Sequence, residues 1–134
     1  MGAVAGERGN RGVLHAGTGK VGHCDIAGRA PAGRAGAQLT QALAGHRNVG
    51  EVRGDGMLAA VEFVQDRDDR VFFDPALKVG PQVASALADS GVIGRAMPQG
   101  DILGFAPPLC LRREEADTIV AKTADAVNSV LANI

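Results

Sequence analysis

The stretch Gly94–Leu109, GRAMPQGDILGFAPPL, decides the fold because it contains a turn and a strand that ends abruptly. The apolar run Ile102–Phe105 predicts a strand, and Pro107–Pro108 stop it because proline cannot donate to a sheet. The turn residues MPQGD separate this run from a second short strand at Val92–Ile93, which leads into Arg95. These two strands can pair as an antiparallel hairpin.

A helix is predicted immediately before this hairpin. Asp74 is suited to cap a helix N-terminus, and Pro75 is suited to the first helical position. Gly91 is placed to end the helix. Between them, apolar residues recur along one helical stripe: Val79, Val83, Ala86 and Leu87.

Further upstream, the pattern predicts two strands and one more helix. Apolar residues over 57–64 predict a strand, preceded by a short strand over 51–53 and by two glycines at the entrance. Leu39 and Leu43 lie four residues apart among good helix formers, which predicts a short helix over about 35–45.

The C-terminal residues predict an amphipathic helix from about Arg113 to the end, with Glu114 and Glu115 favourably placed in its first turn. Its apolar positions recur at three and four: Ala116, Ile119, Val120, Thr123, Val127, Val130, Leu131 and Ile134. The order helix, two strands, helix, two strands, helix predicts an α+β fold, with helices packed on one face of a small, mainly antiparallel sheet.

The first 34 residues differ in composition from the rest of the chain. Residues 1–34 hold nearly half of the glycines with few large apolar groups, so we predict a poorly ordered Gly/Arg/Ala-rich segment there. Residues 35–134 form the predicted folded domain. Charge is also uneven, because residues 1–50 carry six Lys/Arg against two acids, and residues 51–134 carry eight against thirteen.

Composition disfavours several classes of function. The net charge of -1 argues against nucleic acid as a partner, because binding phosphates needs a clustered basic surface. We expect neither a membrane span nor a signal peptide, since no apolar run is long enough. Cys24 and Cys110 have no metal-type or disulfide-type spacing, which fits a reduced, cytoplasmic setting.

Two sequence patterns near the N-terminus suggest sites only superficially. The stretch HAGTGKVGH resembles a phosphate loop, but Leu14 and Val21 stand where that loop needs a glycine and a hydroxyl. His15 and His23 with Cys24 lack a fourth metal ligand at a usual spacing. We therefore expect no nucleotide site and no metal site.

The acidic run over 65–70 is interpreted as a solvated turn rather than a calcium loop.

Two charged residues near the predicted strands deserve separate interpretations. Glu62 lies on an otherwise apolar strand, so it either pairs with an arginine such as Arg53 or lies at a sheet edge, and a structural role is favoured. Arg95 follows a strand expected to be partly buried and can bind a carboxylate through its guanidinium fork. The alternative is a surface arginine paired with Asp89 or Asp101.

Taken together, these motifs resemble a known family. The segments VGEVRGDGMLAAVEFV and DPALKVGPQVASALADSGVIGRAMPQGDILGFAPPLCLRREEADTIV, with the closing helix, resemble the C-terminal part of class III aminotransferases, pyridoxal-phosphate enzymes that include the omega-amino acid:pyruvate transaminases. The resemblance covers roughly residues 35–134. It implies the small C-terminal domain of fold-type I aminotransferases, which closes over an active site built mainly on a larger domain.

The resemblance also implies a function. Family enzymes move an amino group from an amine or amino acid to a keto acid through pyridoxal phosphate, and they are usually homodimers. Arg95 matches the family position that can hold a substrate carboxylate. No part of this chain matches the motifs of the Schiff-base lysine, of the aspartate facing the pyridine nitrogen or of the phosphate-binding groups. The segment over 1–34 also departs from the family, as a truncated or frame-shifted gene product would.

The sequence therefore predicts a C-terminal aminotransferase fragment with no catalytic, cofactor-binding or metal-binding residue of its own. The isolated chain is expected to be inactive and not to bind pyridoxal phosphate, because its lysines fall on helices or in the glycine-rich segment. The alternative is a noncatalytic α+β module that self-associates or binds a protein partner through an exposed apolar face.

Overall fold

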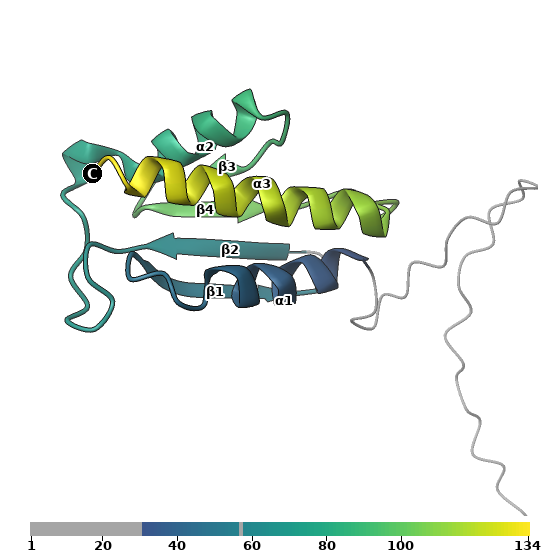
Figure 1. Ribbon diagram of the computed structural model, residues 1–134, viewed down its shortest axis with the longest axis horizontal. Helices are drawn as coiled ribbons and strands as arrows, with labels where there is room; N and C mark the ends of the chain where they lie inside the picture. The colour runs from purple at the N-terminus through teal and green to yellow at the C-terminus, as the bar shows by residue number, and fades with distance from the viewer. Residues whose placement is uncertain (1–30, 57) are drawn as a thin grey trace, which may run out of the picture.

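The computed structural model describes residues 31–56 and 58–134 as three α-helices, a short 3-10 helix and a four-stranded sheet (Figure 1). Along the chain the elements are α1 (Pro31–Leu43), β1 (Val49–Asp55), β2 (Leu58–Phe63), the 3-10 helix η1 (Pro75–Leu77), α2 (Val79–Asp89), β3 (Arg95–Ala96), β4 (Ile102–Phe105) and α3 (Arg113–Leu131). None of the helices in this part of the chain is long and apolar enough to cross a membrane.

The sheet is antiparallel throughout, with the order β1-β2-β4-β3. Of the two inner strands, β2 precedes α2 in the sequence and β4 follows it. Their register places Val61 opposite Leu103 and Ala59 opposite Phe105. Strands β3 and β4 form the hairpin that the GRAMPQGDILGF sequence predicts, with Ala96 opposite Leu103. The predicted α+β fold with a small antiparallel sheet is therefore confirmed.

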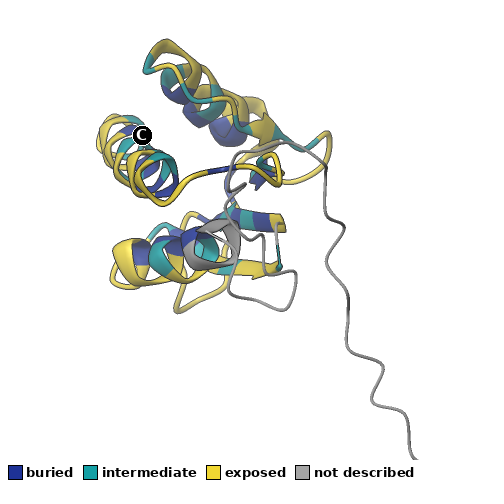
Figure 2. Cartoon of the chain, turned by 90° about the vertical axis from the view of Figure 1, so that its right-hand side faces the viewer, coloured by how far each residue is buried: buried dark blue, intermediate teal, exposed yellow. Residues whose placement is uncertain are grey.

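Burial alternates along β2, and this alternation decides which face the helices cover. Ala59, Val61 and Phe63 are buried, whereas Leu58, Ala60 and Glu62 are not. Helix α1 packs on β1 and β2, α2 packs on β3 and β4, and α3 packs on α1 and α2. The buried residues, which are dark blue in Figure 2, form one core, and those buried most completely include Leu39, Leu43, Val61, Phe63, Val79, Val83, Leu87, Leu103 and Val127.

The first helix begins earlier than the predicted domain boundary at residue 35. Helix α1 starts at Pro31, a residue whose fixed φ suits the first helical turn. Leu39 and Leu43, four residues apart, are both buried against the sheet, as their spacing predicts. The remainder of the predicted glycine-rich segment, residues 1–30, lies outside the described residues.

The prediction of one helix starting at Asp74 is wrong, because the chain breaks at Lys78. Asp74 does cap the first turn, since its Oδ1 accepts the backbone N–H of Ala76 at 2.9 Å. That turn is the 3-10 helix, and Lys78 then takes the left-handed conformation with φ 50° and ψ 49°. A second carboxylate contacts the first turn of α2, where Asp101 Oδ1 accepts the backbone N–H of Gly80 at 2.8 Å. Docking of α2 on the 97–101 turn thus overrides the continuous helical pattern.

Strand boundaries near the hairpin also differ from the prediction. Val92 and Ile93 form no strand, and β3 consists of Arg95 and Ala96 instead. The reason is the end of α2, where Gly91 takes a positive φ of 89° and the N–H of Val92 still bonds to the carbonyl of Leu87 at 3.1 Å. Gly91 therefore ends α2 as predicted, but the closing turn uses the residue expected to start the strand.

Helix α3 begins with a cap that the sequence analysis did not foresee. Arg112 precedes the helix without a capping hydroxyl, but its own backbone N–H donates to Glu115 Oε2 at 2.8 Å, and its guanidinium donates to Oε1 at 3.1 Å. These hydrogen bonds lower the pKa of the Glu115 carboxyl below its ordinary value, and the bond from the Arg112 backbone N–H has the largest effect. Glu115 thus supplies half of a capping box.

Because of this cap, the stability of the fold should fall as the pH becomes acidic. A carboxyl whose pKa is lower in the folded state stabilises the fold above its unfolded pKa, and that contribution is lost as the pH falls through the folded pKa. We expect Glu115→Gln to lower Tm at about pH 7 and to have a progressively smaller effect as the pH falls through the folded-state pKa, because the carboxyl is then protonated in the folded protein too. Thermal melts followed by circular dichroism across this range measure the effect. Glu114→Gln is the matched control, and an equal pH dependence in both variants would count against the cap.

Candidate functional site

The face of the sheet opposite the helices carries two arginines in one row. Arg95 on β3 lies opposite Gly104 on β4, which lies opposite Ala60 on β2, which lies opposite Arg53 on β1. Directly opposed residues point to the same face of a sheet. Three strand spacings of about 4.8 Å separate the Cα atoms of the two arginines by about 14 Å. The row therefore has a cation at each edge and small residues between them.

Arg53 is already satisfied by two carboxylates. Its Nη1 donates to Glu62 Oε2 at 2.6 Å and to Glu51 Oε2 at 2.9 Å. The hydrogen bond to Glu62, together with the one to Glu51 and both negative charges, raises the pKa of the Arg53 guanidinium above its ordinary value. Of the two alternatives for Glu62, the pairing with Arg53 is confirmed. At this end of the row, the positive guanidinium of Arg53 is therefore already paired with two negative carboxylates.

Arg95 differs from Arg53 in having no such partner. Its side chain is exposed, and among the described residues it makes neither an ion pair nor a side-chain hydrogen bond. The alternative pairing with Asp101 is not found among the described residues, and the Oδ1 atom of that carboxylate instead accepts the N–H of Gly80 at 2.8 Å. Asp89 is not paired with Arg95 either. All the donors of the Arg95 guanidinium are therefore available to a planar carboxylate.

Met97 limits the space beside Arg95. A Cβ atom on Gly104 would lie only 2.5 Å from the terminal methyl group of Met97, so the Met97 side chain lies across the glycine. Gly104 is the register partner of Arg95, and the absence of a side chain there makes room for the thioether. The space beside the Arg95 guanidinium is thus bordered on one side by a flexible apolar group that adapts to different shapes.

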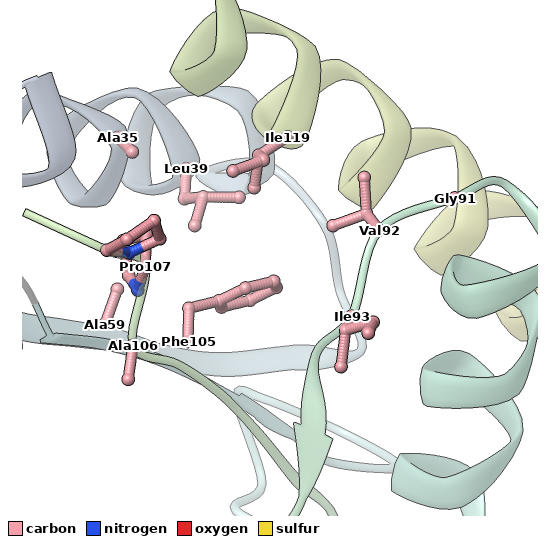
Figure 3. Close-up of a pocket in the computed structure, with 11 residues that line it drawn as sticks. Ala35, Leu39, Ala59, Gly91, Val92, Ile93, Phe105, Ala106, Pro107 and Ile119 are labelled. Carbon is pink, nitrogen blue, oxygen red and sulfur yellow. The ribbon is translucent and has the colours of Figure 1, made fainter. Parts of the chain in front are cut away.

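A separate apolar pocket of about 470 Å³ opens between the helices and the hairpin (Figure 3). Leu39 of α1 and Ile119 of α3 contribute from the helices, and Phe105 contributes from the end of β4. Val92 and Ile93 contribute from the segment between α2 and β3. The other lining residues are Ala35, Ala59, Gly91, Ala106, Pro107 and Pro108. No lining residue has a polar side chain.

The described residues do not fit pyridoxal phosphate, the cofactor that the family resemblance implies. A Schiff-base lysine needs an amine free to react and aligned with the cofactor. Lys122 Nζ instead donates to the carbonyl of Ser90 at 2.5 Å and ties α3 to the end of α2. Lys78 is exposed at the break before α2. Lys20 lies outside the described residues.

The other candidate sites give no support for metal chemistry. Within residues 31–56 and 58–134, no three His, Cys, Asp or Glu side chains gather closely enough to hold a metal ion. The acidic run over 65–70 forms a turn in which Asp66 Oδ1 accepts the N–H groups of Asp68 and Asp69, as the interpretation as a turn requires. The histidines and cysteine of the N-terminal pattern, and the glycine-rich HAGTGKVGH stretch, lie outside the described residues.

Neither the apolar pocket nor the exposure of Ile93 was predictable from the local sequence pattern. The strand expected at Val92–Ile93 was to be partly buried, but Ile93 is 91% exposed. The pocket takes its lining from α1, α3, the end of β4 and the segment before β3, which are far apart in the sequence. The only local signal was the apolar character of Val92–Ile93 and of the residues that flank Pro107–Pro108.

No family model matches the chain, whereas individual proteins do. It is 57% identical over 93 residues to diaminobutyrate–2-oxoglutarate transaminase of Halomonas elongata, an alignment that covers 69% of this chain and 20% of the relative. A transaminase structure from work on directed evolution by ancestral reconstruction is 58% identical, with a TM-score of 0.75, and covers 78% of this chain and 23% of that one. A Vibrio fluvialis aminotransferase in its PMP-bound form is 31% identical, with a TM-score of 0.70, and covers 77% of this chain and 22% of that one.

The chain thus spans about a fifth of the length of the curated relatives it matches. The shared part has the small antiparallel sheet with three helices that the sequence motifs predict. High identity in the sequence and agreement in the fold point to the same group of proteins. The chain belongs to the class III aminotransferases, of which its described residues form the C-terminal domain.

Proposed function

We propose that this chain takes part in transamination, in which an amino group passes from an amine or amino acid to a keto acid, and that Arg95 binds the carboxylate of the substrate. One observation carries the assignment to Arg95. Of the two arginines in the row across the open sheet face, Arg53 is satisfied by Glu51 and Glu62, whereas Arg95 has no ion-pair partner among the described residues. A bidentate pair with a carboxylate satisfies such a guanidinium.

The cofactor belongs elsewhere in this proposal. Because Lys78 and Lys122 do not fit a Schiff base, pyridoxal phosphate is held outside the described residues in this proposal, and we expect the isolated chain to be inactive. When bound, pyridoxal phosphate supplies the electron sink for breaking bonds at the amino carbon. The contribution of this chain is to hold and orient a carboxylate next to that chemistry. A homo-oligomer is the proposed assembly of the complete enzyme.

The cellular setting is part of this proposal, and a second candidate function stands beside it. The setting is cytoplasmic, which is supported by the lack of disulfide-type spacing between Cys24 and Cys110. The second candidate function, a noncatalytic module that binds a protein partner, is favoured by the wholly apolar lining of the 470 Å³ pocket. The two candidates differ in whether Arg95 affects turnover.

A chimera provides the test for Arg95. Residues 35–134 replace the matching region of the Halomonas elongata diaminobutyrate transaminase, and kcat/KM is measured with amino donors that carry or lack a carboxylate. We expect Arg95→Ala to lower kcat/KM by about 10- to 100-fold for donors with a carboxylate, since a hydrogen bond to a charged group contributes about 1.5–3 kcal/mol. Donors without a carboxylate should change by less than about twofold, because their transition state makes no such pair.

Arg53→Ala in the same chimera is the matched control, because Arg53 lies in the same row but is already paired. Arg53→Ala should change kcat/KM by the same factor for donors with and without a carboxylate. Equal losses for both kinds of donor in Arg95→Ala would refute the carboxylate role and favour a structural one. The unmodified chain of 134 residues alone, with pyridoxal phosphate added, should show no turnover, and specific turnover would contradict the assignment of the cofactor to another part.

A further inference from the structure

The N-terminus of α2 is capped by a residue that is distant in the sequence. An N-cap side chain normally accepts the backbone N–H two or three residues further on, because the first N–H groups of a helix have no partner within it. The N-cap residue of α2, Lys78, makes no such side-chain bond. The buried N–H two residues further on belongs to Gly80, and Asp101 Oδ1 accepts it at 2.8 Å. A Cβ atom on Gly80 would lie 3.4 Å from Asp101 Cα, so α2 packs directly on the backbone of its capping residue.

Asp101 ends the turn of the hairpin that carries Arg95. At the start of this turn, the N–H of Met97 donates to the carbonyl of Ile102 at 2.9 Å and closes the β3–β4 hairpin. The backbone of Asp101 is fixed as well, because its carbonyl accepts the N–H of Phe63, the last residue of β2, at 2.8 Å. Asp101 therefore joins three parts of the fold: the hairpin turn, the end of β2 and the start of α2.

Helix α2 also contacts the other end of the short strand β3. Gly94 immediately precedes Arg95, and a Cβ atom there would lie 2.9 Å from Leu103 Cδ1 and 3.1 Å from Leu87 Cδ2. Leu87 lies near the end of α2 and Leu103 lies on β4, so the backbone at position 94 lies between these two elements. Because β3 has only two residues, its position depends on such contacts at both of its ends.

We propose that Asp101 is a positioning residue for Arg95: its hydrogen bond to Gly80 fixes the 97–101 turn on α2, and with it the two-residue strand that carries the arginine. The side chain of Arg95 is exposed and has no ion-pair partner among the described residues, so the backbone beneath it decides where the guanidinium lies. A displacement of about 1 Å in a group that orients a substrate can cost about 100-fold in rate. This inference rests on the proposed function for the role of Arg95, but not for the effect of Asp101 on the hairpin.

Hydrogen exchange of the Met97 amide in the 134-residue chain tests the effect on the hairpin. A short edge strand exchanges by local detachment, and the Asp101–Gly80 bond opposes detachment because it must break first. We expect Asp101→Ala to speed the exchange of the Met97 amide by about fivefold or more, as the loss of one hydrogen bond in the attached state implies. Asp101→Asn keeps an oxygen that can accept the N–H of Gly80, so its exchange rate should lie closer to that of the natural chain than to that of Asp101→Ala.

Asp74→Ala is the matched control, because Asp74 Oδ1 also accepts a backbone N–H, that of Ala76 at 2.9 Å, but caps η1 instead of α2. Both alanine variants can lower the global stability and thereby speed the amides of β2, since core strands exchange through global unfolding. Only Asp101→Ala should speed the Met97 amide. An equal increase at Met97 in Asp74→Ala, or no increase in Asp101→Ala, overturns the proposal. Should Asp101→Ala not fold alone, the comparison is made in the chimera, by mass spectrometry of peptides that contain residue 97.

Turnover in the chimera tests the consequence for Arg95. We expect Asp101→Ala to lower kcat/KM by about 3- to 10-fold for donors with a carboxylate, less than Arg95→Ala because the arginine is still present. The loss should appear mainly in KM, since a misplaced guanidinium weakens binding that the ground state and the transition state share. Donors without a carboxylate should change by less than about twofold, and Asp101→Asn should recover most of the loss. Equal losses for both kinds of donor would show a merely structural role and overturn the proposal.

Failure of this inference is distinguishable from failure of the proposed function. If Asp101→Ala speeds the exchange of Met97 but Arg95→Ala affects both kinds of donor equally, Asp101 fixes the turn and only the role of Arg95 is wrong. If Arg95→Ala lowers the turnover of carboxylate donors selectively while Asp101→Ala changes neither the exchange nor the turnover, only the role of Asp101 is wrong. Exchange is measured without substrate, so the two readouts do not depend on each other.

Discussion

Phe63→Ala should reduce the free energy of unfolding by about 3–5 kcal/mol, the cost of removing a large buried aromatic side chain and leaving a cavity. Phe63 has no exposed surface and lies on β2, one of the two inner strands, opposite Val49 of β1. Its side chain belongs to the one core that joins the helices to the sheet. Because small domains are stable by only about 5–15 kcal/mol, this single change should remove a large part of that stability.

The matched control is the same substitution at Phe72, which is exposed. Phe72→Ala should change the free energy of unfolding by no more than about 0.5 kcal/mol, because it removes few buried contacts. Urea unfolding followed by circular dichroism gives both values, and the slope with urea should stay the same in the two variants. Losses of similar size at the two positions would mean that β2 does not hold the centre of the core.

Leu103→Ala should cost about 2–5 kcal/mol for the same reason, but its cavity can be partly refilled. Leu103 is fully buried on β4 and lies opposite Val61 of β2 and Ala96 of β3. A Cβ atom on Gly94 would lie 2.9 Å from Leu103 Cδ1, which is too close in the natural protein. Gly94→Ala alone should therefore destabilise the fold by about 1–3 kcal/mol through overpacking.

The double variant tests this geometry. With the leucine shortened to alanine, the added methyl at position 94 enters the space that Leu103 Cδ1 occupied. We expect the double variant to be more stable than the sum of the two single losses by about 0.5–3 kcal/mol, the usual range for residues in contact. Equilibrium unfolding of all four proteins completes the cycle. Additive losses would show that Gly94 and Leu103 do not compete for the same space.

Regular elements were predictable from the sequence because each shows its own periodicity. The alternation around Val61 and Phe63 predicts β2, and the spacing of Ala116, Val120 and Val127 predicts the buried stripe of α3, since these patterns repeat over several turns or residues. The pairing of Glu62 with Arg53 was also predictable, because a carboxylate on a half-buried strand needs a partner nearby.

Other features depend on contacts between distant residues and leave no local pattern. The break at Lys78 follows from the hydrogen bond between the Asp101 carboxylate and Gly80, 21 residues apart. The absence of an ion pair between Arg95 and Asp101 among the described residues likewise depends on the folded chain and leaves no local pattern. The apolar pocket is formed by several elements at once, so only the folded chain reveals it.

The attachment of Arg95 to the sheet has a consequence for motion. Strand β3 has only two residues, lies at the edge of the sheet, and is paired on one side alone, with the N–H of Met97 adding a bond to the carbonyl of Ile102. So short a strand detaches at a free energy well below that of global unfolding. Its amide hydrogens should exchange with solvent sooner than those of β2. The guanidinium of Arg95 can therefore change position through local fraying, while the domain beneath it stays folded.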